Sequence, residues 1–194
     1  RVFAYQKRTN GAFALMDFDE RLRAYEDIFI KFNKIHSLST YKNLDEVAKD
    51  SLGILEFSNF SSAKVVIDIG SGAGFPAVFL AMKMSECTFH LFEPNAKKSS
   101  FLSYAKAHLG LENIVVHSKK IEDEEPFRAD IITSRAAFKV TDLLSCSKGF
   151  YDENTLFALF KGSSIEAELS ELKAQISIKK AKERNYVFIK GVKC

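Results

Sequence analysis

Three glycines at alternating positions, Gly70, Gly72 and Gly74, follow an apolar and mostly β-branched run at residues 65–69. Glycine lets the backbone approach a ligand closely, because it has no Cβ. Pro76 follows, and proline suits the first turn of a helix, where its missing N–H would have no partner anyway. A strand, a glycine turn and a helix N-terminus in this order predict a site for a nucleotide-like cofactor.

A carboxylate follows the glycine loop by about twenty residues, the distance at which an α/β sheet holds a ribose hydroxyl. Residues 88–93 are predicted as a strand that ends at Glu93. The alternative is that Glu93 stabilises the N-terminus of the next helix, where a carboxylate is favourable. Glu93 is the predicted ribose ligand.

The glycine spacing distinguishes between two cofactor classes. A dinucleotide site has the pattern G-x-G-x-x-G, but Phe75 stands at its last position. The pattern here is G-x-G-x-G, preceded by Asp68, which favours S-adenosylmethionine, a cofactor without a pyrophosphate. The loop therefore predicts a methyltransferase over an NAD-dependent oxidoreductase. A purely structural strand-to-helix turn remains the alternative.

Alternating strands and helices position this loop from residue 64 onward. Because βαβ crossovers are right-handed, this order predicts a mostly parallel sheet covered on both faces. Two helices precede it, at 19–35, capped by Asp17 or Asp19, and at 43–57. We expect a helical extension at 1–60 and a sheet domain at 61–194. Strands are predicted at 64–69, 88–93, 113–117, 129–134, 155–160, 175–180 and 186–190, and helices at 76–84, 96–109, 140–149 and 164–174.

The composition indicates a globular protein. The 194 residues are 46% hydrophobic and 27% charged, and no apolar run approaches the roughly 18 residues of a membrane span. The start at Arg1 is not a methionine and carries no signal-peptide core, which predicts a cytoplasmic protein whose true start lies upstream. Three scattered cysteines and four histidines without ligand spacing predict reduced thiols and no metal. Monomer is the default expectation.

The net charge of +3 is small, but basic residues gather near the C-terminus. Such a cluster favours phosphate groups. The alternative is that lysines prevent an edge strand from pairing with other chains. Residues 173–193 contain one acidic residue, Glu183, and seven basic residues: Lys173, Lys179, Lys180, Lys182, Arg184, Lys190 and Lys193.

From about Leu22 to Lys190 the chain resembles the bacterial small-subunit rRNA guanine-N7 methyltransferases, historically called glucose-inhibited division protein B. The order and spacing of several short motifs carry the resemblance. Lys120 and Asn185 depart from it, standing where the family usually has Arg and His. The motifs are Phe32-Asn33-Lys34, Leu38-Ser39, Lys49-Asp50-Ser51-Leu52, the run from Gly70 to Pro76, the run from Glu93 to Leu102, Leu111-Glu112-Asn113-Ile114, Ser134-Arg135-Ala136 and Lys161-Gly162.

The resemblance implies a class I, Rossmann-like methyltransferase fold of seven strands with a C-terminal antiparallel hairpin. It implies methyl transfer from S-adenosylmethionine to N7 of a guanosine in the decoding-region (530) loop of 16S rRNA. The partner is then 16S rRNA, the 30S subunit or an assembly intermediate. The implied cofactor residues are Gly70, Ser71, Gly72, Gly74, Phe75, Glu93, Ile121, Glu122 and Arg135, with Ile121 and Glu122 beside the adenine.

Arg135 and Lys161 are the implied catalytic residues, with Arg135 at the cofactor or at the mouth of the acceptor pocket. The implied RNA contacts are Lys97, Lys98, Lys161 and Arg184. Each has a structural alternative: an ion pair of Arg135 with Glu122 or Asp130, and solvated lysines. Phe138 is a minor candidate for base stacking. Guanine N7 carries no proton, so the reaction needs no general base.

Three other functions remain open from the sequence. The protein is a methyltransferase for another RNA or for a small molecule, or a non-catalytic rRNA-binding assembly factor that keeps the fold. The third is the oxidoreductase, which Phe75 disfavours.

Overall fold

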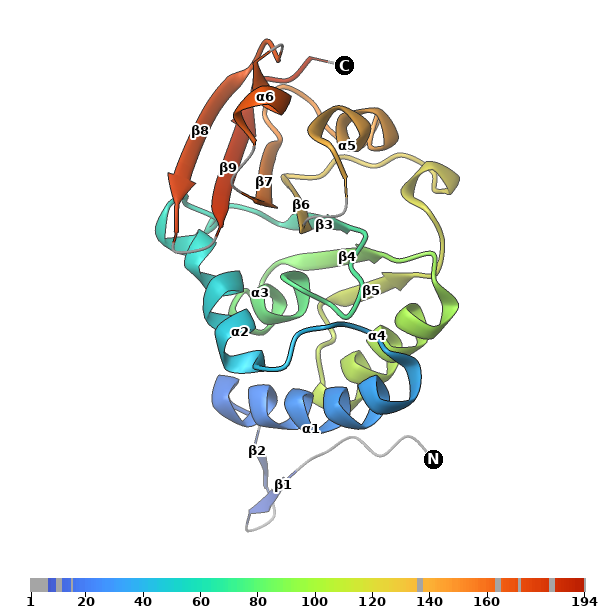
Figure 1. The fold of residues 1–194 in the computed structure, drawn as a ribbon. Helices are drawn as coiled ribbons and strands as arrows, with labels where there is room; N and C mark the ends of the chain where they lie inside the picture. The colour runs from blue at the N-terminus through green and yellow to red at the C-terminus, as the bar shows by residue number, and fades with distance from the viewer. Residues whose placement is uncertain are drawn as a thin grey trace.

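A seven-stranded sheet forms the centre of the protein (Figure 1). The computed structural model describes residues 7–9, 12–14, 16–135, 138–162, 165–170, 172–181 and 184–193. The strands are β3 (Val65–Ile69), β4 (Thr88–Phe92), β5 (Ile114–His117), β6 (Ile131–Arg135), β7 (Leu156–Lys161), β8 (Gln175–Lys180) and β9 (Asn185–Lys190). Their order is β5-β4-β3-β6-β7-β9-β8; β3 to β7 are parallel, and β9 is antiparallel to both neighbours. The predicted parallel sheet with a C-terminal hairpin is confirmed.

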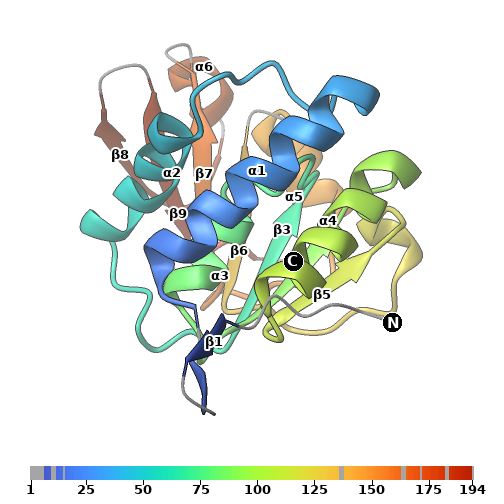
Figure 2. The same ribbon diagram turned by 90° about the horizontal axis from the view of Figure 1, so that it is seen from below.

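Helices cover both faces of the sheet, as Figure 2 shows. On one face lie α1 (Phe18–His36), α2 (Leu44–Gly53), α3 (Ala77–Lys83) and α4 (Ala96–Leu109); on the other lie α5 (Val140–Cys146) and α6 (Glu166–Leu169). Side chains alternate along each strand, so Val66 packs in the first layer and Ile67 and Ile69 in the second. Two short 3-10 turns, η1 (Ile54–Glu56) and η2 (Ile121–Asp123), complete the described elements of this region.

The N-terminal helices pack directly against the glycine loop. Residues 77–82 of α3 are all buried, because α3 lies between the sheet and α1 and α2. Tyr25 of α1 contacts the rings of Phe75, Phe79 and Phe101. Its hydroxyl also donates to the carbonyl of Ala73. The helical extension thus supports the loop through a shared core, and the boundary at residue 60 stays a prediction.

Local signals explain where two long helices begin and end. Asp17 caps α1, and its side chain and that of Glu20 form a reciprocal capping box, so Asp17 is the cap among the two predicted. Asn95 caps α4, and Gly110 ends it in the left-handed region at φ 63°. Both helices match the predicted ranges to within one residue.

Three expected elements are corrected. The helix predicted at 164–174 is wrong in length, because α6 ends at Leu169 and the chain turns so that Leu172 and Ala174 pack against the second layer before β8. The helix at 43–57 divides into α2 and η1. A two-stranded hairpin, β1 (Lys7–Thr9) and β2 (Ala12–Ala14), precedes α1 within the stretch expected to be helical. Ala136, Ser164, Lys182 and Glu183 lie outside the described residues.

Candidate cofactor and acceptor site

The predicted cofactor residues lie at the carboxyl ends of four adjacent parallel strands, β5, β4, β3 and β6. The glycine loop follows β3, Glu93 follows β4, and η2, with Ile121 buried and Glu122 exposed, follows β5. Arg135 ends β6, the strand on the other side of β3. The chain runs from β3 outward in one direction and from β6 outward in the other, so ligands are expected in the crevice between these two strands.

The glycine loop requires glycine at two points for different reasons. Gly72 has φ 58°, and its N–H donates to Oε2 of Glu93 at 2.8 Å. Gly74 has φ 94°, and a Cβ there would stand 2.4 Å from Cγ2 of Val78 and 3.0 Å from Cδ2 of Leu102. Gly74 therefore lets the loop pack tightly against α3 and α4, whereas Gly72 turns an N–H toward Glu93.

Glu93 is buried and holds the loop from the β4 side. Its Oε2 accepts from Gly72, and its Oε1 accepts from the N–H of Asn95 at 2.8 Å. Asn95 is the N-cap of α4, because its side chain accepts from the N–H groups of Lys97 and Lys98. Glu93 accepts from the N–H of this cap residue, so the alternative in which its carboxylate stabilises the N-terminus of α4 stays open. Ribose binding by Glu93 stays a prediction.

Asp68 of β3 is a buried carboxylate, 1% exposed, with one unsatisfied oxygen. Its Oδ1 accepts from the hydroxyl of Thr133 at 2.7 Å, while its Oδ2 has no hydrogen-bond partner. Burial raises its pKa to about 7, against the lowering effect of the Thr133 hydrogen bond. Asp68 was recognised in the sequence only as the acid that precedes the glycine pattern, although a charged residue inside an apolar strand is itself a signal of a functional group.

Arg135 is also buried, with its side chain 6% exposed, and its partner differs from the expected ones. One terminal nitrogen lies 2.8 Å from Oδ2 of Asp50, and the other donates to the hydroxyl of Ser51 at 3.1 Å. The alternatives of an ion pair with Glu122 or Asp130 are therefore wrong. Nε of Arg135 is buried without a hydrogen-bond partner.

Asp50 of α2 joins Arg135 to the C-terminal hairpin. Nε of Arg184 lies 2.8 Å from Oδ2 of Asp50 and donates to its Oδ1 at 3.0 Å. The hydroxyl of Tyr186 donates to the carbonyl of Asp50 at 2.9 Å, and burial together with Asp50 raises its pKa to about 12. Asp50 was missed as a functional residue, because Arg184 is 134 residues away in the sequence.

Of the remaining predicted basic residues, Lys161 has a buried side chain, whereas Lys97 and Lys98 lie at the surface. The ammonium group of Lys161 lies 3.2 Å from Glu168 and donates to the carbonyl of Phe138, and its side chain is 9% exposed. Lys97 is exposed and Lys98 half-buried in the first turn of α4. Lys161 thus ties β7 to α6, and the RNA contacts of all three lysines stay predictions.

The unsatisfied atoms beside the glycine loop fit the amino-acid end of S-adenosylmethionine. Oδ2 of Asp68 is an acceptor and Nε of Arg135 a donor, and the two groups are close enough for Arg135 to lower the pKa of Asp68. An α-ammonium group needs the first and an α-carboxylate the second. The residues present therefore fit this cofactor.

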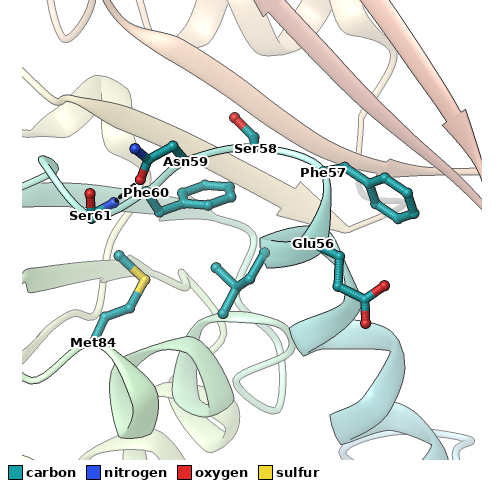
Figure 3. A pocket seen from close by; sticks show the side chains of 8 residues that line it. Glu56, Phe57, Ser58, Asn59, Phe60, Ser61 and Met84 are labelled. Carbon is teal, nitrogen blue, oxygen red and sulfur yellow. Dashed lines mark hydrogen bonds between the residues drawn. The ribbon is translucent and has the colours of Figure 1, made fainter.

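A large cavity lies away from this site. It has a volume of about 610 Å³ and is lined by residues 55–61 and Met84, as Figure 3 shows. Met84 follows α3, and residues 55–61 precede β3, so this hollow is at the amino ends of the strands, opposite the glycine loop. Within the described ranges no group of His, Cys, Asp or Glu could hold a metal ion, and no helix is long and apolar enough to cross a membrane.

Residues 19–193 match the family described as rRNA small subunit methyltransferase G, also named GidB. The chain belongs to this family. The ribosomal RNA small subunit methyltransferase G of Campylobacter fetus is 51% identical over 92% of this chain and 97% of its own length. That of Campylobacter curvus is 54% identical over 89% of this chain and 91% of its own length.

Solved methyltransferase structures of low sequence identity have a similar fold. A SAM-dependent methyltransferase from Aquifex aeolicus has a TM-score of 0.65 at 17% identity, over 84% of this chain and 98% of that one. The ribosomal protein L11 methylase of Lactobacillus delbrueckii has a TM-score of 0.62 at 18% identity, over 75% and 79%. These similarities confirm the methyltransferase fold that the sequence predicted.

Proposed function

We propose that this protein transfers the methyl group of S-adenosylmethionine to N7 of a guanosine in the 530 loop of 16S rRNA. The observation that carries the proposal is the match of residues 19–193 to the methyltransferase G family, with nearly the whole of the C. fetus relative covered. The intact glycine loop argues against a protein that keeps the fold without turnover. We expect the protein to work in the cytoplasm as a monomer, on 16S rRNA, the 30S subunit or its assembly intermediate.

Four groups of this chain would hold the cofactor, which supplies the methyl group when bound. Asp68 would accept from its ammonium group, and Nε of Arg135 would donate to its carboxylate. Glu93 would accept from the ribose hydroxyls with the acceptor sites that its two N–H donors leave free. Ile121, buried within η2, would pack beside the adenine. These contacts fix the orientation of the donor, which is the main source of rate in a two-reactant displacement.

The acceptor chemistry fits the residues at the crevice. N7 of guanine has a lone pair and no proton, so the carboxylates of Asp68 and Glu93 are needed for binding and not as bases. The base must leave its stack to reach the crevice. Arg135 and Arg184 share the single carboxylate of Asp50, which leaves this side of the crevice positively charged. This positive charge favours the phosphate groups of the rRNA that carries the acceptor guanine.

The test is methyl transfer from labelled S-adenosylmethionine to 30S subunits from a strain that lacks the endogenous activity. Borohydride–aniline cleavage then maps N7-methylguanosine along the rRNA. We expect one cleavage, in the 530 loop. Transfer to another nucleotide or to none, with the cofactor bound, would refute the assigned acceptor, and absence of cofactor binding would refute the methyltransferase itself.

A further inference from the structure

Tyr41 is a half-exposed aromatic residue at the crevice between β3 and β6. It lies in the connection between α1 and α2, and 37% of the residue's surface is exposed. The guanidinium carbon of Arg135 is 4.9 Å from its ring centre, and the ring of Phe75 meets it edge-on at 5.9 Å and 77°. Tyr41 therefore contacts the glycine loop on one side of the crevice and the end of β6 on the other.

The connection that carries Tyr41 is held in place by hydrogen bonds. Asn33 of α1 donates to the carbonyl of Ser39 at 3.0 Å and accepts from its N–H at 2.9 Å. The hydroxyl of Ser39 in turn accepts from the N–H of Tyr41 at 3.3 Å. The backbone of Tyr41 is thus fixed before any ligand binds, which lowers the ordering cost of a contact made by its ring.

The hydroxyl end of Tyr41 faces the charged side of the crevice. Burial raises its pKa, but the guanidinium groups of Arg135 and Arg184 lower it more, so the net pKa falls below the ordinary value for tyrosine. The ring is therefore anchored by cations and by Phe75, while over a third of the residue's surface stays exposed. A flat, fixed and partly open ring is what a nucleobase needs for stacking.

We propose that Tyr41 is the stacking platform for the acceptor guanine. The inference rests on the proposed function and names the residue that positions its substrate. Phe138 is similarly exposed, at 38%, and follows β6. Tyr41 is the better platform because its contacts with Phe75 and Arg135 place it across the crevice, where the base must meet the methyl donor.

The kinetic test compares Tyr41→Leu, Tyr41→Phe and Tyr41→Trp with the wild-type protein on 30S subunits. Because stacking is lost only in the first, we expect its kcat/KM for 30S to fall about tenfold to hundredfold. Tyr41→Phe and Tyr41→Trp should stay within about threefold of wild type, since both keep an aromatic face. The Kd for S-adenosylmethionine should not change. Tyr104→Leu is the matched control, because Tyr104 is also half-exposed but lies on α4.

A second measurement does not depend on turnover. The chain contains no tryptophan, so the variants Tyr41→Trp and Tyr104→Trp each carry a single indole fluorophore. We expect 16S rRNA, at a concentration that the protein binds, to quench the fluorescence of Tyr41→Trp strongly and that of Tyr104→Trp weakly. S-adenosylmethionine alone should quench neither.

Three results would overturn the proposal. The first is wild-type kcat/KM in Tyr41→Leu, and the second is equal quenching of the two tryptophan variants by bound rRNA. The third is a loss of cofactor affinity in Tyr41→Leu as large as the loss of kcat/KM, which would make Tyr41 a cover for the cofactor. If the wild-type protein methylates 30S subunits and any of these results is found, the proposed function stands and only the platform fails.

Discussion

The glycine loop and the Asp50 network, which is Asp50 with Arg135 and Arg184, flank the same crevice but consist of different kinds of groups. The loop side consists of backbone N–H groups, small residues and two buried carboxylates, Asp68 and Glu93. The network consists of long charged side chains brought together from α2, β6 and the C-terminal hairpin. The loop side depends on close packing, and the network side depends on the balance of charge.

This difference predicts that the two sides fail in different ways. Close packing does not tolerate a single added methyl group where no space exists. A charge network tolerates changes of shape, but it loses much when one partner of a buried pair is removed. Variants on either side therefore test whether the crevice is divided in this manner.

The largest effect is expected from Gly74→Ala. The new Cβ would meet Val78 at 2.4 Å on a backbone with φ 94°, so we expect a loss of about 3 kcal/mol in the free energy of unfolding. Methyl transfer should fall by about a hundredfold, because the loop shifts. Gly110→Ala, also at positive φ but with nothing within 4 Å, is the control and should cost about 1 kcal/mol. Equal costs in chemical denaturation would contradict tight packing as the cause.

The next effect is expected from Asp50→Asn, which leaves Arg135 and Arg184 facing each other without a carboxylate. Because Asp50 is about a quarter exposed, we expect a loss of about 2 kcal/mol in stability, less than for a fully buried pair. Activity should fall about tenfold as Arg135 moves. Asp152→Asn, which breaks the exposed pair with Arg128, should leave the midpoint of denaturation almost unchanged. The opposite ranking would show that the network is not structural.

Asp68→Asn is expected to stabilise the protein while weakening cofactor binding about tenfold. The pKa of Asp68 is about 7 in the folded protein and near 4 when unfolded, so between these values the folded state holds more protons. Wild-type stability therefore falls as pH rises from 4 to 7, and the loss persists above 7. The advantage of Asp68→Asn should grow over this window to on the order of 4 kcal/mol. Melting curves of Asp68→Asn and the wild-type protein from pH 4 to pH 8 test this, with the exposed Asp45→Asn as the control. A stability difference between them that does not change with pH would contradict the prediction.

The smallest effect is expected from Lys97→Ala at the rim of the loop side. If Lys97 contacts one phosphate, rRNA affinity should fall a few-fold, and the slope of log K against log salt should drop by about 0.7 to 0.9. Lys64→Ala is the control, since this lysine is exposed but directly precedes β3, at the end of the strands opposite the glycine loop. Equal slopes for the two variants would remove Lys97 from the RNA contacts.

The sequence predicted the loop side well, because its signals are local. The boundaries of α4 follow from Asn95 and Gly110, and the glycine pattern with Glu93 identifies the carboxyl ends of β3 and β4. The network side was predicted only in part. Arg135 and Arg184 were predicted from the family resemblance. No sequence pattern around Asp50 or Tyr41 indicates that these two side chains lie beside Arg135 and Arg184.

Two further differences between the sequence predictions and the structure have the same physical origin. The helix predicted at 164–174 has helical spacing, but packing of Leu172 and Ala174 against the second layer overrides it. Lys161 was predicted as a functional cation, with a solvated lysine as the alternative, and its buried ion pair with Glu168 becomes visible only when β7 and α6 are placed together. Tertiary contacts decide both, and spacing along the chain does not encode them.

The position of β9 between β7 and β8 also determines the order in which parts of the protein can form during synthesis. During synthesis, the glycine loop and α1 to α4 are complete long before Arg184 emerges from the ribosome. Asp50 therefore cannot pair with Arg184, which lies 134 residues further along the chain, until late in synthesis. Until β9 is made, β7 is an open edge of the sheet, which is prone to pair with other strands. Contacts this distant in sequence form slowly. The nascent protein therefore completes the Asp50 network last, and a chain released before Arg184 would carry the glycine loop and the Asp50–Arg135 pair without the second arginine.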